Sequence, residues 1–260
     1  MWAGGLLSWE AFHEAEETPL CETRTHHVRA HIETSRERLE ARDAAYFHDV
    51  LPGSERWRLF DAFRDSVAYI DIETTGLGDP DDYITSIALY DGRSIRTFVY
   101  DDNLFDFANA IRDYKLLVTY NGKSFDVPFI RNTMGLPMHQ AHIDLMYVLR
   151  ALGYRGGLKG CERQLGISRG DLEGVDGFAA VLLWFDYLNH DNRKALETLL
   201  AYNVEDVVNL ETLMVIAWNL KVKETPFADT LTLPMPSVPP SPFRADVETL
   251  RRLKREFRPF

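Results

Sequence analysis

Residues 69–77 read Tyr-Ile-Asp-Ile-Glu-Thr-Thr-Gly-Leu, a β-rich run that carries two acidic side chains and ends in a glycine turn. Because side chains alternate along a strand, Asp71 and Glu73 point to one face, while Ile70 and Ile72 enter the other. Two carboxylates at neighbouring positions of one face repel each other unless a hard divalent cation lies between them, and Mg²⁺ prefers such oxygen ligands. Taken alone, the motif also fits two acids at a solvated strand end.

The pattern around this run indicates a mixed sheet flanked by helices. Three β-rich stretches separated by turn residues predict an antiparallel meander. A helix, a short buried strand and a mainly helical half follow, and this order predicts an α/β fold. The expected elements are strands at 67–73, 83–90 and 94–100, a helix at 104–114, a strand at 116–120, and helices at 126–133 and 193–220.

A third acidic position follows the strand expected at 116–120, where residues 120–129 read Tyr-Asn-Gly-Lys-Ser-Phe-Asp-Val-Pro-Phe. A glycine turn and a helix start place Asp126 at the carboxyl end of the sheet, where sites of α/β proteins lie. A helix cap is the alternative role for Asp126, with proline in the first turn. On the last long helix, Tyr202 and Asp206 have i, i+4 spacing and therefore lie on one side.

The motifs Asp-x-Glu, Asn-x₃-Phe-Asp and Tyr-x₃-Asp, in this order and on these elements, resemble those of the DEDD exonuclease superfamily in the subtype with tyrosine in the last motif. They look closest to the exonuclease domains of B-type DNA polymerases and to stand-alone ribonuclease H-like relatives. The resemblance covers about residues 66–221. It implies a ribonuclease H-like, five-stranded mixed sheet with the strand at 67–73 in the centre.

This resemblance implies a 3′–5′ exonuclease that hydrolyses phosphodiester bonds at single-stranded nucleic-acid ends, with DNA favoured over RNA. Two Mg²⁺ or Mn²⁺ ions would be held by Asp71, Glu73, Asp126 and Asp206, and Asp71 is the best candidate to bridge them. Tyr202 would orient the attacking water, because a phenol with a pKa of about 10 is a poor base at neutral pH. Mutual repulsion of the carboxylates leads us to expect that Asp206→Ala abolishes activity while stability is kept or rises slightly.

Further residues in these motifs are candidates for substrate binding. By resemblance, Leu77 would wedge near the terminal base, and Lys159 in Leu-Lys-Gly would contact the substrate backbone. Lys123 can neutralise a phosphate, and Phe125 either stacks on a base or belongs to the core. The complete set of expected substrate contacts is Thr74, Leu77, Asn121, Lys123, Phe125 and Lys159.

Composition restricts the function classes. Lys and Arg number 29 against 40 Asp and Glu, so the net charge is −11, which argues against coating nucleic acid by bulk electrostatics but not against a nuclease. The two cysteines, Cys21 and Cys161, exclude a disulfide framework and a four-cysteine zinc site. The longest apolar run, Phe178 to Phe185, is too short to span a bilayer, and no secretory signal is recognised, so we expect a cytoplasmic protein.

The segments outside the motifs have no counterpart in the exonuclease pattern. Residues 1–65 are expected to form a helical N-terminal extension, with a capping box at 34–37 starting a helix that runs towards Phe47. Residues 222–260 divide into a Pro-rich strap and a short basic helix, with Leu250, Leu253 and Phe257 at helical spacing. That helix either docks on the domain or contacts a polyanion.

Two groups of residues that contain histidine could bind a metal, but each has a structural interpretation that we prefer. His26, His27 and His31 are interpreted as a solvated helix face, and His142 with Asp144 as a strand end followed by a helix cap. Two alternative functions stay open from the sequence. One is a ribonuclease or structure-specific endonuclease of the same fold, and the other is a non-catalytic module that binds nucleic acid. Four clustered carboxylates argue against the second, because a binding groove has no use for negative charge without metal.

Overall fold

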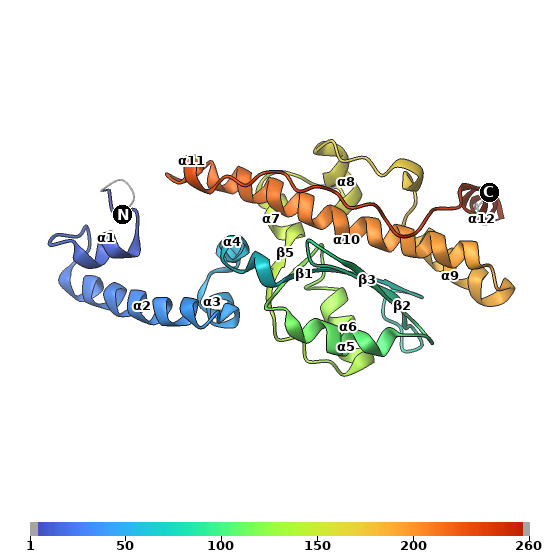
Figure 1. Cartoon of the computed structure of the whole chain (residues 1–260), viewed down its shortest axis with the longest axis horizontal. Helices are drawn as coiled ribbons and strands as arrows, with labels where there is room; N and C mark the ends of the chain where they lie inside the picture. The colour runs from blue at the N-terminus through green and yellow to red at the C-terminus, as the bar shows by residue number, and fades with distance from the viewer. Residues whose placement is uncertain (1–4, 257–260) are drawn as a thin grey trace.

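The central strand of the predicted sheet lies in the middle of a five-stranded mixed sheet in the order β3-β2-β1-β4-β5. The computed structural model describes residues 5–256. In it, β1 pairs antiparallel with β2 and parallel with β4, and β2 with β3 and β4 with β5 complete the sheet (Figure 1). The strands are β1 (Val67–Thr74), β2 (Ile84–Tyr90), β3 (Ile95–Val99), β4 (Leu116–Thr119) and β5 (Ala141–Asp144). The predicted fold class is confirmed.

Alternation along β1 divides its side chains between two apolar layers. Ile70 and Ile72 pack with Phe107 on one side of the sheet, whereas Tyr69 packs with Val207 and the other apolar residues of the long C-terminal helix. Asp71 and Glu73 lie on the same face of β1 as Tyr69, so they face that helix. A register shift between Glu73 and Thr74 ends the regular pairing of β1 with β2 just after the second carboxylate.

Helices cover both faces of the sheet. The long helix α10 (Arg193–Val222) crosses one face, and α5 (Phe107–Ala110) and α6 (Asp126–Met134) lie on the other (Figure 1). The helix expected over 104–114 is broken into 3₁₀, α and 3₁₀ turns. The remaining elements of this half are η4 (Leu104–Asp106), η5 (Ile111–Asp113), α7 (Leu145–Ala151), α8 (Gly157–Gln164), η6 (Gly170–Leu172) and α9 (Gly177–His190).

The N-terminal extension is helical, but the capping box at 34–37 does not start a helix. Thr34 lies inside a continuous helix, where its hydroxyl donates to the carbonyl oxygen of Ala30 at 3.2 Å instead of capping an end. The helix ends at Glu40, and Asp43 caps the next helix by accepting a hydrogen bond from the backbone N–H of Tyr46. The elements are α1 (Trp9–Glu14), α2 (Glu22–Glu40), α3 (Ala44–Val50), η2 (Gly53–Arg58), α4 (Leu59–Phe63) and η3 (Arg64–Ser66).

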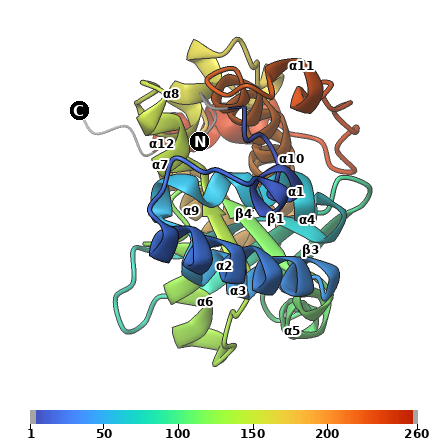
Figure 2. The same cartoon turned by 90° about the vertical axis from the view of Figure 1, so that its left-hand side faces the viewer.

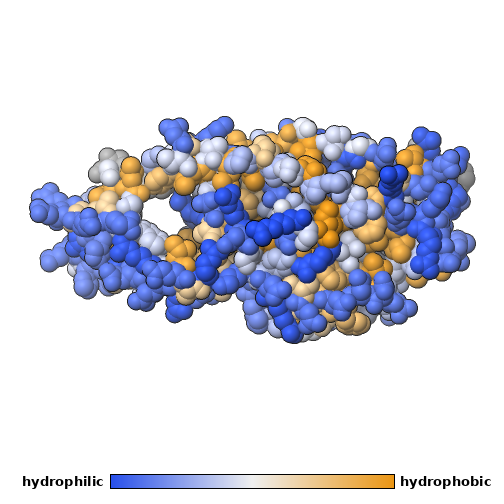
Figure 3. Space-filling view, in the orientation of Figure 1, coloured by the Kyte–Doolittle hydropathy of each residue, from blue (hydrophilic) through white to orange (hydrophobic). Residues whose placement is uncertain are grey.

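This extension reaches from one end of the molecule to the edge of the sheet. Viewed from that end, α2 and α3 lie in front of the sheet, and α3 contacts β5 (Figure 2). His26, His27 and His31 are exposed on α2, as a solvated helix face requires. Hydrophilic residues cover these helices in Figure 3. At η2 and α4 the extension becomes apolar, and Trp57 and Phe60 pack against Trp218 of α10.

The C-terminal strap returns along α10 to the opposite end of the domain (Figure 1). It contains one short helix, α11 (Ala228–Leu231), before the dense prolines, and it ends at α12 (Val247–Glu256). Leu250 and Leu253 of α12 are buried, and the Arg252 guanidinium lies 2.5 Å from the carboxylate of Asp186 on α9. The helix is therefore docked on the domain through the face carrying these residues. Phe257, expected on the same face, lies outside the described residues.

Within residues 5–256, no helix is both long enough and apolar enough to cross a lipid bilayer.

Candidate active site

Four carboxylates from three elements meet at the carboxyl end of β1. One oxygen from each of Asp71, Glu73 and Asp206 can be chosen so that all lie within 4.8 Å of one another. Asp126 joins them from the first turn of α6, where its Oδ1 accepts the backbone N–H of Ile72 at 3.2 Å. Asp126 is not the N-cap of α6, since Phe125 holds that position. The sequence motifs thus converge on one place.

The loop that delivers Asp126 has a tightly specified backbone. Asn121 has φ +65°, a left-handed conformation that asparagine tolerates better than most residues. A Cβ at Gly122 would lie 2.4 Å from Thr119 Oγ1, so a larger residue does not fit there. The Asp144 carboxylate accepts the backbone N–H groups of Asn121 at 2.8 Å and Lys123 at 3.0 Å. These constraints fix the turn between β4 and α6.

Burial and mutual repulsion make this cluster costly when it is fully charged. Burial raises the pKa of Asp71 and of Glu73 well above the usual range, and the charge of Asp206 raises both further. Burial likewise raises the pKa of Asp126 to about 7. Hard divalent cations bind such oxygen donors and remove the repulsion. The donor set therefore fits Mg²⁺ or Mn²⁺, and Asp71, Glu73, Asp126 and Asp206 are the residues that can hold them.

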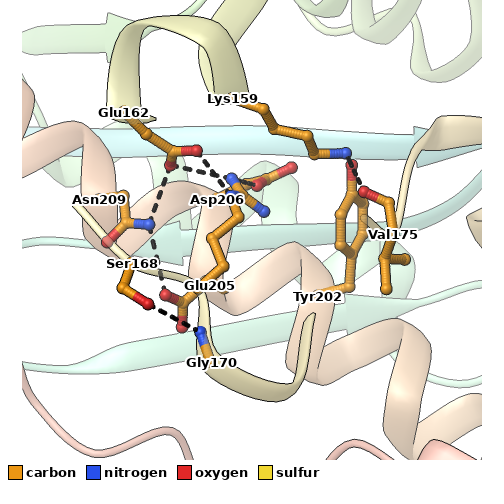
Figure 4. Close-up of polar contacts among 10 residues, drawn as sticks. Lys159, Glu162, Ser168, Gly170, Val175, Tyr202, Glu205, Asp206 and Asn209 are labelled. Atoms are coloured by element: carbon orange, nitrogen blue, oxygen red, sulfur yellow. Dashed lines mark hydrogen bonds and ion pairs between the residues drawn. The ribbon is translucent and has the colours of Figure 1, made fainter. Parts of the chain in front are cut away.

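Tyr202 lies next to the carboxylates, and its hydroxyl is engaged by Lys159. Lys159 Nζ donates to the Tyr202 hydroxyl oxygen at 2.6 Å and also to the carbonyl oxygen of Val175 (Figure 4). Burial raises the pKa of Tyr202, and the charges of Asp206 and Glu73 raise it further, so the phenol keeps its proton. With one lone pair taken by Lys159, the Tyr202 O–H is free to donate elsewhere.

A buried arginine holds Asp206, and the sequence motifs did not identify it. The Arg169 guanidinium contacts Asp206 and pairs with Glu162 through two N–H groups at 2.6 and 2.9 Å. Asn209 donates to the same Glu162 at 2.9 Å (Figure 4). Arg169 is 6% exposed, and its Nη1 has no hydrogen-bond partner. These residues form a charge network behind the carboxylate cluster.

Asn203 is a second contact that the motifs did not identify. Its Nδ2 donates to Asp71 Oδ2 at 2.8 Å, while its Oδ1 accepts from the Ser86 hydroxyl at 3.0 Å. Asn203 therefore ties α10 to both β1 and β2 and fixes the Asp71 carboxylate. The sequence gives one signal for this role, the position of Asn203 between Tyr202 and Asp206 on α10.

A cavity of about 640 Å³ opens over the carboxylates, and most of the expected substrate contacts line it. Leu77 stands on its rim with 92% of its surface exposed, and Phe178, at the start of α9, is 62% exposed on the same cavity. The sequence-predicted residues that line it are Thr74, Leu77, Asn121, Phe125 and Lys159. Phe125 also packs on Phe129, so it belongs to the core as well. Lys123 is not among the lining residues, and it borders a different cavity.

His142 and Asp144 both have hydrogen-bond partners within the protein. Asp144 ends β5 and caps α7 by accepting the backbone N–H of Met146 at 3.0 Å. His142 Nε2 lies 2.8 Å from Thr119 Oγ1 on the neighbouring strand. Both residues hold the sheet edge and the loop after β4, as the strand-end interpretation predicted.

Comparisons with known proteins relate this chain to one superfamily and to a solved structure. Residues 68–218, more than half of the chain, match the RNase H superfamily. The chain belongs to the RNase H superfamily. Among solved structures it is similar to the family B DNA polymerase from the hyperthermophilic archaeon Pyrobaculum calidifontis, with 18% identity and a TM-score of 0.44. That similarity covers 60% of this chain and 24% of the polymerase chain, so it spans about a quarter of that protein.

Comparison with curated proteins finds no match. Superfamily membership supports a nuclease-type activity with nucleic acid as substrate. The acidic cluster formed by Asp71, Glu73 and Asp206 supports the use of a divalent metal in that activity.

The charge network predicts that replacing Arg169 lowers the stability of the fold substantially. Arg169→Met leaves Glu162 and Asp206 buried without their cation, so we expect the free energy of unfolding to fall by about 3–5 kcal/mol. Arg38→Met is the control, because it breaks an exposed ion pair with Asp43 and should cost about 1 kcal/mol or less. Urea unfolding measures both. Equal losses in the two variants would contradict a structural role for the buried network.

The raised pKa of Asp126 predicts how stability depends on pH in chelator. The folded protein holds the Asp126 proton up to about pH 7, whereas the unfolded chain releases it near pH 4, so this contribution to stability is lost as pH rises between those values. The slope should be about 1.4 kcal/mol per pH unit at most. Asp126→Asn lacks this ionisation. The stability of wild type relative to Asp126→Asn, from urea unfolding at pH 5, 6 and 7, should therefore decrease, and a constant difference would refute the raised pKa.

Proposed function

We propose that this protein is a metal-dependent nuclease that removes nucleotides from the 3′ ends of single-stranded nucleic acid. The observation that carries the proposal is the convergence of Asp71, Glu73, Asp126 and Asp206 beside the hydroxyl of Tyr202. Membership of the RNase H superfamily supports the nuclease class. The 3′–5′ direction, the single-stranded substrate and the preference for DNA rest on the resemblance of the three motifs to tyrosine-type DEDD exonucleases.

In the proposed reaction, cations held by the four carboxylates would activate a water molecule and stabilise the leaving oxygen of the phosphodiester. Tyr202 orients that water by donating its O–H. It does not remove the proton, because burial and the neighbouring carboxylates raise its pKa. Lys159 fixes the phenol from the other side at 2.6 Å. Its ammonium group also brings positive charge to the cavity that receives the phosphate.

The rim of the cavity offers apolar surface for bases. Leu77 follows β1 and Phe178 is the second residue of α9, so the two exposed side chains reach the same cavity from different elements. Any of the nucleic-acid bases can stack on an aromatic side chain, so this contact does not depend on the nucleotide sequence. We therefore assign Leu77 and Phe178 to contacts with the terminal bases. In this arrangement the active-site cavity accepts unpaired nucleotides one after another.

A ladder assay tests the proposed activity. Single-stranded DNA and RNA labelled at the 5′ end are incubated with the protein and Mg²⁺ or Mn²⁺. We expect products that shorten by one nucleotide at a time, no cleavage in excess chelator, and protection of a strand whose 3′ end is blocked. Internal cuts on the blocked strand would replace the exonuclease proposal with an endonuclease. Undiminished cleavage in chelator would contradict the metal mechanism.

Two substitutions on α10 separate metal binding from water orientation. Asp206→Ala removes a carboxylate of the cluster and should reduce activity to background. Tyr202→Phe keeps the ring but deletes the hydroxyl, so activity should fall about 10²–10⁴-fold. The double variant should be no worse than Asp206→Ala, because groups that act as one unit are not additive. Asp229→Ala, on exposed α11, is the control and should retain full activity.

These assays also distinguish the two assigned roles. Full activity of Tyr202→Phe together with an inactive Asp206→Ala would leave the metal role standing and refute the orienting role. Full activity of both variants would show that the motif match is a coincidence of spacing. The gain in stability expected from the sequence for Asp206→Ala is not supported, since the substitution removes the ion pair between Asp206 and Arg169.

A further inference from the structure

A second cavity, of about 480 Å³, lies where the N-terminal extension meets the β5 edge of the sheet. We call it the basic cavity. Its cationic lining comes from segments far apart in the sequence: Arg56 from η2, Lys123 from the loop before α6, Arg131 from α6, and Lys221 from the last turn of α10. On a chain of net charge −11, such a cluster of cations marks a site for an anion.

The negative charge in the basic cavity is already engaged. Asp144 is the acidic residue that lines it, and its oxygens accept the backbone N–H groups of Asn121, Lys123 and Met146. Arg56 and Arg131 each donate one N–H group to a backbone carbonyl oxygen, at 3.1 and 2.6 Å. The Asp144 carboxylate balances at most one of the four cations, so the lining keeps a net positive charge of +3 (4 − 1). Burial lowers the pKa of His142 to about 3, and positive neighbours such as Lys123 contribute to the same shift.

The shape of the basic cavity suits a nucleotide. Tyr147 lines it with 48% of its surface exposed, and Lys123 Nζ lies 5.9 Å from the centre of the Tyr147 ring. An aromatic face beside a cation offers a stacking surface for a base and a partner for its phosphate. The volume also falls within the range of about 300–1,000 Å³ typical of small-ligand sites.

One loop joins the basic cavity to the active-site cavity. Asn121 and Phe125 line the active-site cavity, whereas Lys123, between them in the chain, lines the basic cavity. The Asp144 carboxylate holds the backbone of this loop on both sides of Gly122. A nucleic-acid strand bound at the carboxylates would therefore reach the basic cavity by crossing this loop.

We propose that the basic cavity binds the phosphate of a nucleotide several positions away from the 3′ end that is being cleaved. This inference rests on the proposed nuclease function for the source of the phosphate, which is the substrate strand. It also gives the N-terminal extension a role, because His48 and Arg56 complete the cavity from outside the RNase H region. A free mononucleotide carries the same chemistry and is the other source to be tested.

The test neutralises two lysines by replacing each with glutamine, which is one bond shorter and still polar. Lys123→Gln/Lys221→Gln is compared with Lys223→Gln, which removes an exposed charge from the same end of α10 but does not line the cavity. Binding of fluorescent 3-mer and 12-mer oligothymidylate is measured by anisotropy across a salt series, in the Asp206→Ala background so that no strand is cut. Thermal melting confirms that each variant is folded.

We expect the double variant to bind the 12-mer more weakly. The slope of log K against log salt concentration should become less steep by about 1.4, which is about 0.7 for each of the two lost contacts on a single strand. Binding of the 3-mer should match that of the Lys223→Gln control. The rate of 3-mer cleavage, measured with Asp206 intact, should also match that of the control. Binding of AMP, as the free mononucleotide, is measured on the same variants. An unchanged 12-mer affinity and salt slope, with AMP binding also unchanged, would overturn the proposal. Loss of AMP binding alone would support a phosphate site and assign it to free nucleotide.

The outcome is separable from failure of the proposed function. If binding of the 12-mer depends on the two lysines but the protein with Asp206 intact cleaves nothing, the phosphate site in the basic cavity stands and the exonuclease proposal is rejected. Cleavage of the 3-mer with lysine-independent binding of the 12-mer would do the reverse.

Discussion

Repulsion among carboxylates buried at the carboxyl end of β1 is the constraint on which the rest of the site depends. Asp71 and Glu73 share one face of the central strand, and α10 brings Asp206 against them. Burial alone raises the pKa of each carboxyl group, and the shared negative charge raises it further for Asp71 and Glu73. A fold that served only stability would have no reason to gather these groups. Divalent cations remove the penalty, which connects the energetics of the fold to its proposed chemistry.

The surrounding residues limit that repulsion without abolishing it. Arg169 and Glu162 hold Asp206 from behind, Asn203 donates to Asp71, and Lys159 fixes Tyr202. These contacts leave the carboxylates facing a cavity rather than neutralising them completely. Hydrogen bonds therefore orient these side chains in the absence of substrate, which favours the correct placement of a water and a phosphodiester. The cations of the basic cavity lie outside this network, across the loop that follows β4.

Local spacing accounts for the parts that the sequence predicted. Alternation along residues 67–74 places Asp71 and Glu73 on one face, and the i, i+4 spacing on α10 places Tyr202 and Asp206 on one side. The grouping of the four carboxylates from separate elements was implied by the resemblance of the motifs to those of DEDD exonucleases. Arg169 could not be predicted, because Asp206 is distant in sequence, and Glu162, although near in sequence, lies on a helix that ends before Arg169. Lys123 was expected at the active-site cavity and lines its neighbour instead, after the left-handed turn at Asn121. The helix start expected at Thr34 was wrong, because the hydroxyl bonds inside a longer helix.

Thermal melting of wild type and Asp71→Asn, at pH 8 with and without Mn²⁺, tests the central claim most directly. The substitution keeps the shape of the side chain and an oxygen for Asn203 while removing one charge from the cluster. We predict that Asp71→Asn melts at a higher temperature than wild type in chelator, and that Mn²⁺ raises the melting temperature of wild type much more than that of the variant. A wild-type protein that Mn²⁺ does not stabilise, or a variant that is less stable in chelator, would contradict the claim that repelling carboxylates are held together for a metal.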